Sequence, residues 1–373
     1  MPELIRWPLI DERDEEAVLR VLRSGNLARG PESGKLEREW AELLGIDPGR
    51  VMTTSTCTHA LHLAYMGAGC GRGSKVLAPA MTFRGTTDPI LFTGATPIFC
   101  DIEPAYWSID PAEVERRADS DTRAVVAVHL HGTIGMIEDV RQVCRDKGMA
   151  LVEDACQAHG ALTTRQAGCF GTWSAFSLNQ VKPLQGGQGG LLIGPDRVSV
   201  EAIRKVAKVR SYLITEMSAA LARSQLGRLH ENLDRSAAVM ERLASEFGDA
   251  SQSFRLPSSR PGRWSTTWHK VRVTVHSDEG SRKAMRNRAM ELLTHNNVEV
   301  SLWQSGLLPD MPAYREGEPP SEEFPVSREL AEGSFILGSE EFPFAAQQPE
   351  LAAFYAQAFR QVSKELRCQS LST

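Results

Sequence analysis

Short apolar runs alternate with amphipathic stretches through the first half of the chain. Each run is short and is bounded by turn residues, which is typical of a buried strand. We therefore expect strands at 51–55, 75–79, 97–101, 124–130 and 150–154. Between the strands, apolar positions recur at helical spacing. This spacing predicts helices at 14–23, 35–44, 58–66, 85–93, 111–118 and 136–147.

The order of these elements predicts an α/β fold. Nearly continuous apolar strands separated by helices are typical of a mostly parallel sheet that is covered by helices on both faces. Ligands bind to such sheets beyond the carboxyl ends of the strands. Functional side chains are therefore expected where the strands end, and Asp154 is at such an end.

The pattern changes in the second half of the chain. A helical region over 199–247 is followed, after Pro257, by shorter elements. We expect these at 268–275, 281–295 and 298–303. The change predicts a large domain over 1–244, which includes an N-terminal helical segment, and a smaller C-terminal α+β domain over 245–373. The Pro- and Glu-rich segment 309–325 predicts a surface loop.

Composition and charge exclude several classes of function. The chain has 373 residues, a net charge of −5 and no basic block, so nucleic acid is not an expected partner. No apolar run is long enough to span a membrane and no signal-peptide pattern is present, so we expect a cytoplasmic protein. The seven cysteines are odd in number and lack CxxC spacing. They favour a reducing compartment and argue against a structural zinc, and we expect no metal site.

One lysine stands out from this background. Lys182 lies in a polar segment, five residues after Ser177, and is followed by glycines at 186, 187, 189 and 190. Upstream, the expected strand 150–154 ends in Asp154. A lysine in a glycine-rich turn downstream of an acid at a strand end indicates pyridoxal 5′-phosphate (PLP). The lysine would form a Schiff base with the cofactor and the acid would keep the ring nitrogen protonated.

A second glycine-rich segment, 67–73, superficially resembles a dinucleotide-binding loop. Such a loop must follow a strand and open a helix. Segment 67–73 instead closes an expected helix and precedes the strand 75–79, so we interpret it as a helix end and a turn. A nicotinamide-dependent enzyme is not expected.

Six sequence blocks make the chain resemble the DegT-type sugar and cyclitol aminotransferases. They occur in the family's order and read THAL at 58–61, APAMTF at 78–83, GATP at 94–97, VHLHG at 128–132, EDACQAHG at 153–160 and SLNQVK at 177–182. The resemblance covers nearly the whole chain. It implies PLP as cofactor, a homodimer, and fold type I. In that fold, a large domain with a mostly parallel sheet is joined to a smaller C-terminal α+β domain.

The resemblance also implies roles for individual residues. Lys182 matches the Schiff-base lysine, which also moves the substrate Cα proton, and Asp154 matches the partner of the ring nitrogen. Gln157 matches the side chain near the ring oxygen, and Phe83 matches the aromatic that stacks on the ring. The phosphate is expected at the strand–helix turn 51–58, which offers backbone amides and hydroxyls. The expected phosphate-binding residues are Thr56, Cys57, Thr58 and Ser177.

Other polar and aromatic residues near these blocks have simpler interpretations. His129 and His159 are expected to be structural, and Glu153 is expected to be a structural or solvent-exposed acid. Three aromatic residues in the second half of the chain either line the pocket for the amino acceptor or belong to the core. These are Trp268, Trp303 and Tyr314.

The chain departs from the family pattern at several positions. Cys57 stands where the family usually has glycine, and Asn179 stands where many members have histidine. The segment between Lys182 and Leu226 is short. Residues 210–218 occupy the place of a loop that carries an asparagine to the phosphate of the neighbouring subunit, and they contain no asparagine.

These observations predict a PLP-dependent aminotransferase that moves an amino group from L-glutamate or L-glutamine to a keto-sugar or keto-cyclitol. Trp7, Pro8 and the block 58–61 look closer to the branch that acts on cyclitols and amino-hydroxybenzoate precursors than to nucleotide-sugar enzymes. Two alternatives remain open. One is another PLP reaction on this scaffold, such as an elimination or an aromatising dehydration. The other is a catalytically silent relative that binds, regulates or helps a partner enzyme.

Overall fold

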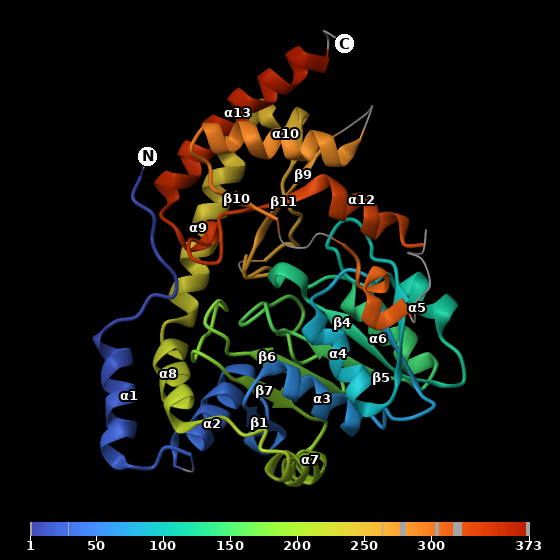
Figure 1. Cartoon of the computed structure of the whole chain (residues 1–373). Coiled ribbons are helices and arrows are strands. Elements are labelled where there is room, and N and C mark those ends of the chain that lie inside the picture. Colours follow the sequence, from blue (N-terminus) through green and yellow to red (C-terminus); the bar gives the residue numbers. More distant parts are fainter. Residues whose placement is uncertain are drawn as a thin grey trace.

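A computed structural model describes residues 2–28, 30–262, 264–276, 281–302, 306–315 and 323–370. Two β-sheets organise the chain, a seven-stranded sheet in the lower part of Figure 1 and a four-stranded sheet in the upper part. The helix α9 (Leu229–Glu246) runs from the lower part to the upper part.

The large sheet is mostly parallel, as expected. Its strands lie in the order β1-β7-β6-β5-β4-β2-β3, and β7 runs antiparallel to both of its neighbours. The bounds are β1 Val51–Thr54, β2 Lys75–Pro79, β3 Thr96–Cys100, β4 Thr122–Val128, β5 Ala150–Asp154, β6 Trp173–Ser177 and β7 Gly190–Ile193. The first five confirm the expected strands with shifts of one or two residues. The sequence pattern did not predict β6 and β7, which flank the glycine-rich segment.

Helices cover both faces of this sheet. Their bounds are α1 Glu12–Ser24, α2 Glu32–Leu44, α3 Cys57–Gly67, α4 Arg84–Thr93, α5 Pro111–Arg117, α6 Ile137–Asp146, α7 Arg197–Val209 and α8 Glu216–Leu226. The region 199–247, expected to be helical, is thus divided among α7, α8 and α9. The segment 67–73 confirms its interpretation, because α3 ends at Gly67 and β2 begins at Lys75.

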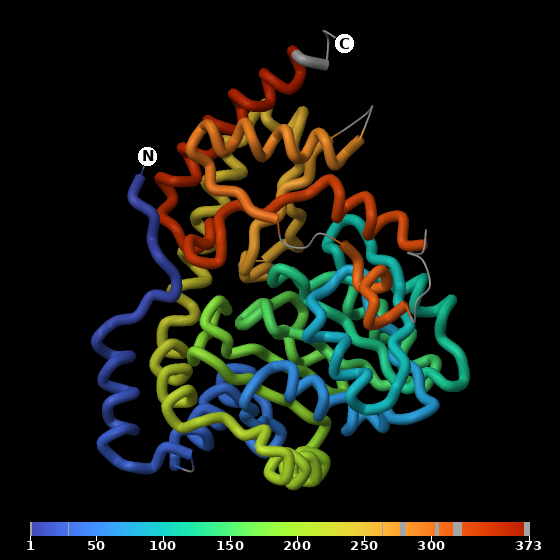
Figure 2. Tube along the Cα trace, viewed as in Figure 1, coloured from blue at the N-terminus to red at the C-terminus, as the bar shows by residue number. Residues whose placement is uncertain are grey.

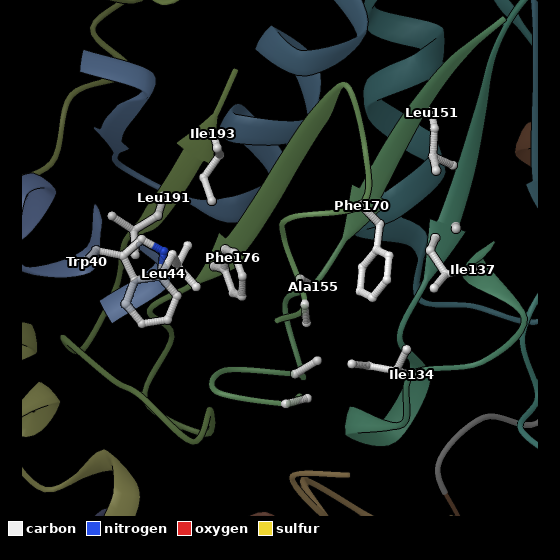
Figure 3. Close-up of a cluster of buried hydrophobic side chains, with 14 of the residues drawn as sticks. Trp40, Leu44, Ile134, Ile137, Leu151, Ala155, Phe170, Phe176, Leu191 and Ile193 are labelled. Atoms are coloured by element: carbon white, nitrogen blue, oxygen red, sulfur yellow. The ribbon is translucent and has the colours of Figure 1, made fainter. Parts of the chain in front are cut away.

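Neighbouring residues of a strand pack into two different hydrophobic cores, because side chains alternate between the faces of a strand. Leu151 packs with α2 and α6, whereas its neighbour Val152 packs with α3, α4 and α7. Figure 3 shows the first of these cores, where Trp40 and Leu44 of α2 meet Phe176 of β6. The sheet is therefore held from both sides, which fixes the positions of its strand ends.

The small sheet is antiparallel and has a third core of its own. Its order is β10-β11-β9-β8. The bounds are β8 Phe254–Arg255, β9 Val271–Val275, β10 Val300–Ser301, β11 Ser334–Leu337, α10 Arg282–His295, α12 Pro325–Gly333 and α13 Pro349–Ser370. Val239 and Leu243 of α9 pack into this core although they precede residue 245. The domain boundary at 244–245 stays a prediction.

The segment expected as a loop over 309–325 is not wholly irregular. It includes part of a short turn of helix at Leu308–Asp310, the helix α11 at Pro312–Arg315 and the first residue of α12. Residues 316–322 lie outside the described part of the chain.

The N-terminal segment lies beside the C-terminal part of the chain, as the tube in Figure 2 shows. The Ile5 N–H donates to Gln347 Oε1 at 2.7 Å, and the Trp7 N–H donates to the Glu341 carbonyl oxygen at 2.7 Å. Farther along, Ala17 and Val21 of α1 pack against Ala220 of α8. In the described ranges, no helix combines the length and the apolar character needed to cross a membrane.

Candidate active site

Every residue that the sequence predicted for the cofactor site lines one cavity of about 660 Å³. These residues are Thr56, Cys57, Thr58, Phe83, Asp154, Gln157, Ser177 and Lys182. They come from strand ends of the large sheet and from the turns that follow. The other wall comes from the small-sheet side and includes His269, Lys270 and Glu340. The cavity thus lies between the two sheets, beyond the carboxyl end of β5.

The turn from β1 into α3 forms one end of the cavity. Thr56 caps the helix, and its hydroxyl accepts a hydrogen bond from the His59 N–H at 3.1 Å. A Cβ added at Gly190 would lie 2.7 Å from the Thr54 hydroxyl and from the Thr56 backbone, so β7 approaches this turn too closely for a side chain. The start of an 11-residue helix, beside the hydroxyls of Thr58 and Ser177, is a favourable place for a phosphate.

Asp154 ends β5 and is 5% exposed. Its Oδ2 accepts from the Thr86 hydroxyl at 2.6 Å, and its Oδ1 accepts from the Cys156 N–H at 3.1 Å. Burial raises the pKa of this carboxyl, while both hydrogen bonds and the charge of Lys182 oppose the rise. A buried carboxylate whose pKa is raised gains from a cationic neighbour, because the neighbour offsets its lost hydration. The ring nitrogen of PLP, once protonated, would supply that charge.

Lys182 lies on a turn closed by backbone hydrogen bonds. The Leu178 N–H donates to the Gly189 carbonyl at 2.9 Å, and Gly187 and Gly189 have positive φ angles of 76° and 154°. The amine Nζ lies 3.5 Å from His269 Nε2. Burial lowers the pKa of Lys182 to about 8. Near neutral pH, this lysine therefore has a larger fraction of the neutral amine, the form that adds to an aldehyde, than an exposed lysine has.

We expect the rate at which the cofactor-free protein captures PLP covalently to rise with pH, with a midpoint near 8. The reason is that loss of the Lys182 proton creates the nucleophile. The neighbouring charges act in opposite directions, since Asp154 raises the pKa of Lys182 and Lys270 lowers it. Asp154→Asn should therefore move the midpoint to lower pH, and Lys270→Met should move it to higher pH. Stopped-flow absorbance measures the rate, and a midpoint near 10.5, or shifts with reversed signs, would contradict this picture.

Gln157 and Phe83 line the cavity between these ends. Gln157 Oε1 accepts from the His131 N–H at 2.6 Å, which leaves the amide nitrogen as a donor toward a ligand. Phe83 is 63% exposed, so it is not a core residue. A Cβ added at Gly85 would lie 3.0 Å from the Phe83 ring, so the absence of a side chain at Gly85 keeps room for the ring. An exposed aromatic at a cavity wall suits stacking on a ligand ring.

Three charged or titratable neighbours of the cavity are buried. Glu153 is fully buried and accepts hydrogen bonds from His129 Nε2 at 2.9 Å and from several backbone N–H groups. Burial alone would raise the pKa of Glu153, but these hydrogen bonds bring it below its usual value. The His159 ring contacts the rings of both Trp40 and Phe176. These contacts fit a structural role for Glu153 and His129 and rule out a solvent-exposed Glu153. His159 is buried as well, but neither of its ring nitrogens has a hydrogen-bond partner among the residues that the structure describes.

Among the described residues, the lining of the main cavity does not include Trp268 or Tyr314, two of the aromatic residues considered for the acceptor pocket. Trp268 packs against the third core and borders a small pocket of about 40 Å³, which shares Lys182 and His269 with the main cavity. The Tyr314 hydroxyl interacts with Thr87 at 2.7 Å, and its ring meets Phe99 edge-on. The core interpretation fits Tyr314, whereas for Trp268 the choice between the core and the acceptor pocket stays open. Trp303 lies outside the described residues.

Cys57 and Cys156 are joined by a disulfide at the wall of the cavity. The cysteine spacing gave no sign of this pair, because the two residues are 99 positions apart. The sulfur atoms and an Asp154 oxygen lie within 4.8 Å of one another, a spacing that suits metal ligands. Sulfur binds metals as thiolate, and both sulfur atoms are used by the disulfide.

The short segment 210–218 turns back to the β1–α3 turn of its own chain. The Ser55 N–H donates to the Tyr212 carbonyl at 2.7 Å, and the Tyr212 ring stacks on His59 with 3.8 Å between centroids. This segment therefore supports the expected phosphate end from within the chain. The absence of an asparagine contact to the phosphate of the neighbouring subunit stays a prediction.

The sequence did not predict several side chains of the cavity that contact predicted residues or carry a charge. Thr86 holds Asp154, His269 lies beside Lys182, and Lys270 lies 3.7 Å from Glu340. Thr86 lies on α4, and its spacing after Phe83 gives no signal that it reaches β5. His269 and Lys270 precede β9 of the small sheet, so only the packing of the two sheets reveals them.

Each part of PLP has a group of suitable chemistry in the wall of this cavity. A helix start with hydroxyls suits the phosphate, a buried carboxylate suits the ring nitrogen, and an amine with a lowered pKa suits the aldehyde. Together with the mostly parallel sheet, they define a PLP enzyme of fold type I.

Residues 8–341 match the DegT/DnrJ/EryC1/StrS aminotransferase family, and the chain belongs to it. Relatives of this chain include sugar and cyclitol aminotransferases, and one of them is named as a putative pyridoxal phosphate-dependent aminotransferase. This finding confirms the family resemblance, the enzyme class, the cofactor and the fold class.

Individual relatives span most of the chain. The dTDP-3-amino-3,4,6-trideoxy-alpha-D-glucose transaminase of Streptomyces venezuelae is 30% identical over 85% of this chain and 84% of its own length. The L-glutamine:2-deoxy-scyllo-inosose aminotransferase of Streptomyces kanamyceticus is 30% identical over 70% and 68%. The solved structure of the aminotransferase TlmJ from Streptoalloteichus hindustanus is similar over 100% of both chains, with a TM-score of 0.85 and 25% identity.

Proposed function

We propose that the protein transfers an amino group from L-glutamate or L-glutamine to the keto group of a sugar or cyclitol, with Lys182 and Asp154 as catalytic residues. The observation that carries this proposal is a lysine of lowered pKa that shares one cavity with a buried carboxylate. The six sequence blocks match both residues to the positions that carry the chemistry in the family.

PLP, when bound, supplies an electron sink that stabilises negative charge at the substrate Cα. Asp154 would hold the ring nitrogen in its charged form, and the start of α3 with Thr56, Thr58 and Ser177 would bind the phosphate. Lys182 would hold the cofactor covalently, and its amine, when free, would take the Cα proton from the amino donor and release it later in the transfer. Gln157 would orient the ring through its amide nitrogen.

The identity of the substrates is argued from relatives and from the cavity. One relative is named for a nucleotide-linked amino sugar, and another is named for L-glutamine and a cyclitol ketone. The cavity wall offers polar side chains suited to hydroxyl groups, among them Gln188, Ser301, Ser339 and Glu340. We favour a keto-cyclitol as the acceptor and biosynthesis of an amino sugar or aminocyclitol, such as an antibiotic component, as the setting. A cytoplasmic location stays a prediction.

We expect L-glutamate or L-glutamine to bleach the visible absorption of the PLP-loaded protein and to leave the cofactor in its amine form. The donor gives its amine to the cofactor and leaves as a keto acid. Absorbance and chromatography of both products measure this half-reaction. Adding candidate keto-sugars and keto-cyclitols to the amine form should restore the visible band only for the true acceptor. If neither donor changes the absorbance, the transferase assignment fails.

Two alternatives to an aminotransferase remain, another PLP reaction and a helper relative. The short segment 210–218 is the observation that favours them. An eliminating or aromatising PLP enzyme would keep its visible band with glutamate and glutamine but release an unsaturated product from its own substrate. A helper relative would show activity only after a second protein is added. The donor experiment separates both from an aminotransferase.

We propose a homodimer. Phe92 and Val209 are 58% and 88% exposed, and Phe83 at the cavity is also exposed. Phe92 meets His62 edge-on, and His62 lies 3.2 Å from the Tyr212 hydroxyl, so this apolar surface adjoins the expected phosphate end. A second subunit would cover it. Light scattering should give the mass of two chains, and Val209→Asp should shift it toward one. A wild-type mass of a single chain would contradict the proposal.

A further inference from the structure

A second cavity, of about 160 Å³, lies between the small sheet and the loop that joins β3 to α5. None of the residues that line it lines the active-site cavity. Its wall includes Arg255, Ser258, Arg272 and Thr274 from the small-sheet side and Trp107 from the loop. In the described part of the chain, this lining contains two arginines and no acidic side chain.

The strand register places three of these side chains on one face of the small sheet. Arg272 and Thr274 are two positions apart on β9, and side chains two apart share a face. Arg255 of β8 pairs directly with Thr274. Because paired residues project to the same side, both arginines and the Thr274 hydroxyl face the loop that carries Trp107.

The Arg272 guanidinium is buried, and its charge is incompletely compensated. The residue is 2% exposed, and its Nη2 has no hydrogen-bond partner. Its Nη1 lies 3.4 Å from His131 Nδ1, and its Cζ lies 4.5 Å from the centre of the Trp107 ring. A buried guanidinium is costly unless an anion and hydrogen bonds satisfy it. Burial and, to a smaller extent, the charge of Arg255 lower the pKa of Arg272 to about 9.

Glu103 is the carboxylate whose charge opposes this effect. Its oxygens are occupied within its own loop, because they accept hydrogen bonds from the Ala105, Tyr106 and Ser108 N–H groups and from the Ser108 hydroxyl. Glu103 therefore does not satisfy Arg272 directly. The charge of Arg272, which lines the cavity, is thus left incompletely compensated beside that of Arg255, and two such charges at one cavity point to a ligand that brings its own negative oxygens.

We propose that this cavity binds a phosphate group, held by Arg272 and Arg255 with the hydroxyls of Thr274 and Ser258. The planar guanidinium presents paired N–H donors that match phosphate oxygens, and charge-assisted hydrogen bonds of this kind are strong. Phosphate offers more acceptor oxygens than a carboxylate and so suits two arginines and two hydroxyls together. A cavity of about 160 Å³ is smaller than the ~300–1,000 Å³ typical of sites for whole small molecules, so it suits one such group.

Calorimetric titration of inorganic phosphate into the PLP-loaded protein tests this proposal. The loaded protein is used because its cofactor already fills the phosphate end of the active site. We expect one binding event that Arg272→Met weakens by about tenfold or more, since it removes a charged hydrogen-bond donor. Arg255→Gln, at an exposed position, should also weaken it measurably. Arg260→Gln is the matched control, because Arg260 stacks on Tyr106, donates to the Gly135 carbonyl and does not line the cavity.

A phosphate ester, glycerol 3-phosphate, identifies the source of the phosphate group, and acetate tests whether the cavity selects phosphate over a carboxylate. Glycerol 3-phosphate binding more tightly than inorganic phosphate would indicate a phosphate ester, and the reverse order would indicate the free anion. The proposal is overturned if phosphate does not bind, if acetate binds as tightly, or if Arg255→Gln and Arg272→Met both leave the affinity unchanged. Arg272→Met also removes the contact with His131, whose N–H binds Gln157 of the active site. If that variant does not fold or does not hold PLP, Arg255→Gln alone decides.

Discussion

Lys182→Ala should abolish both the visible absorption of the covalently bound cofactor and the transfer of amines. Lys182 is the lysine whose pKa is lowered to about 8 within the candidate site, and its amine has two tasks in the proposed reaction. Loss of proton transfer alone costs about 10²–10⁴-fold in rate. The loss of the covalent anchor adds to this, so we expect turnover to fall to background in an assay with glutamate and a keto acceptor.

A second lysine in the same cavity supplies the control. Lys270 lines the cavity and lies 3.7 Å from Glu340, and burial lowers its pKa as well. Lys270→Ala should keep the visible absorption and a substantial part of the turnover. If Lys182→Ala retains full turnover, or if Lys270→Ala alone removes the visible band, then the lysine has been misassigned.

Asp154→Asn should lower kcat by about 10²–10³-fold while leaving the cofactor covalently bound. The amide keeps the shape of the carboxyl but cannot supply a negative charge to the ring nitrogen. The estimate follows the cost of removing one preorganised electrostatic partner from an active site. Because the linkage to Lys182 does not depend on this charge, the visible absorption should persist, which distinguishes this variant from Lys182→Ala.

Thr86→Val is the matched control for Asp154. It removes the hydroxyl that donates to Asp154 Oδ2 at 2.6 Å but keeps the carboxylate charge. A hydrogen bond to a charged group contributes about 1.5–3 kcal/mol, or roughly 10- to 150-fold. Because the Cys156 N–H still donates to the carboxylate, we expect a loss at the lower end of this range, about tenfold in kcat. An Asp154→Asn variant as active as Thr86→Val would show that the carboxylate charge is not needed.

The local pattern predicted the large sheet well, because its strands are nearly continuous apolar runs that stand out between polar turns. β2 and β5 have the predicted bounds, and Asp154 is at the predicted strand end. β6 and β7 were harder, since the glycine-rich turn that carries Lys182 separates two short strands of which one is antiparallel. The predicted cofactor residues come together because strand ends of one sheet meet at one edge.

What the sequence could not predict depends on contacts between distant segments. Thr86 reaches Asp154 across 68 positions, and His269 reaches Lys182 across 87. The pair Cys57 and Cys156 meets only because α3 and the turn after β5 border the same cavity. The burial of Arg272 against Trp107 depends in the same way on a contact between distant segments, the strand β9 and the loop after β3.

Locating the covalently bound cofactor tests the central claim most directly. Borohydride converts the bond between a lysine and PLP into a stable amine, and peptide mass spectrometry then identifies the modified residue. We predict that Lys182 carries the cofactor in the wild-type protein and that Lys270, which lines the same cavity, does not. Modification of Lys270 or of any other lysine in place of Lys182, or the absence of a modified peptide, would contradict the assignment.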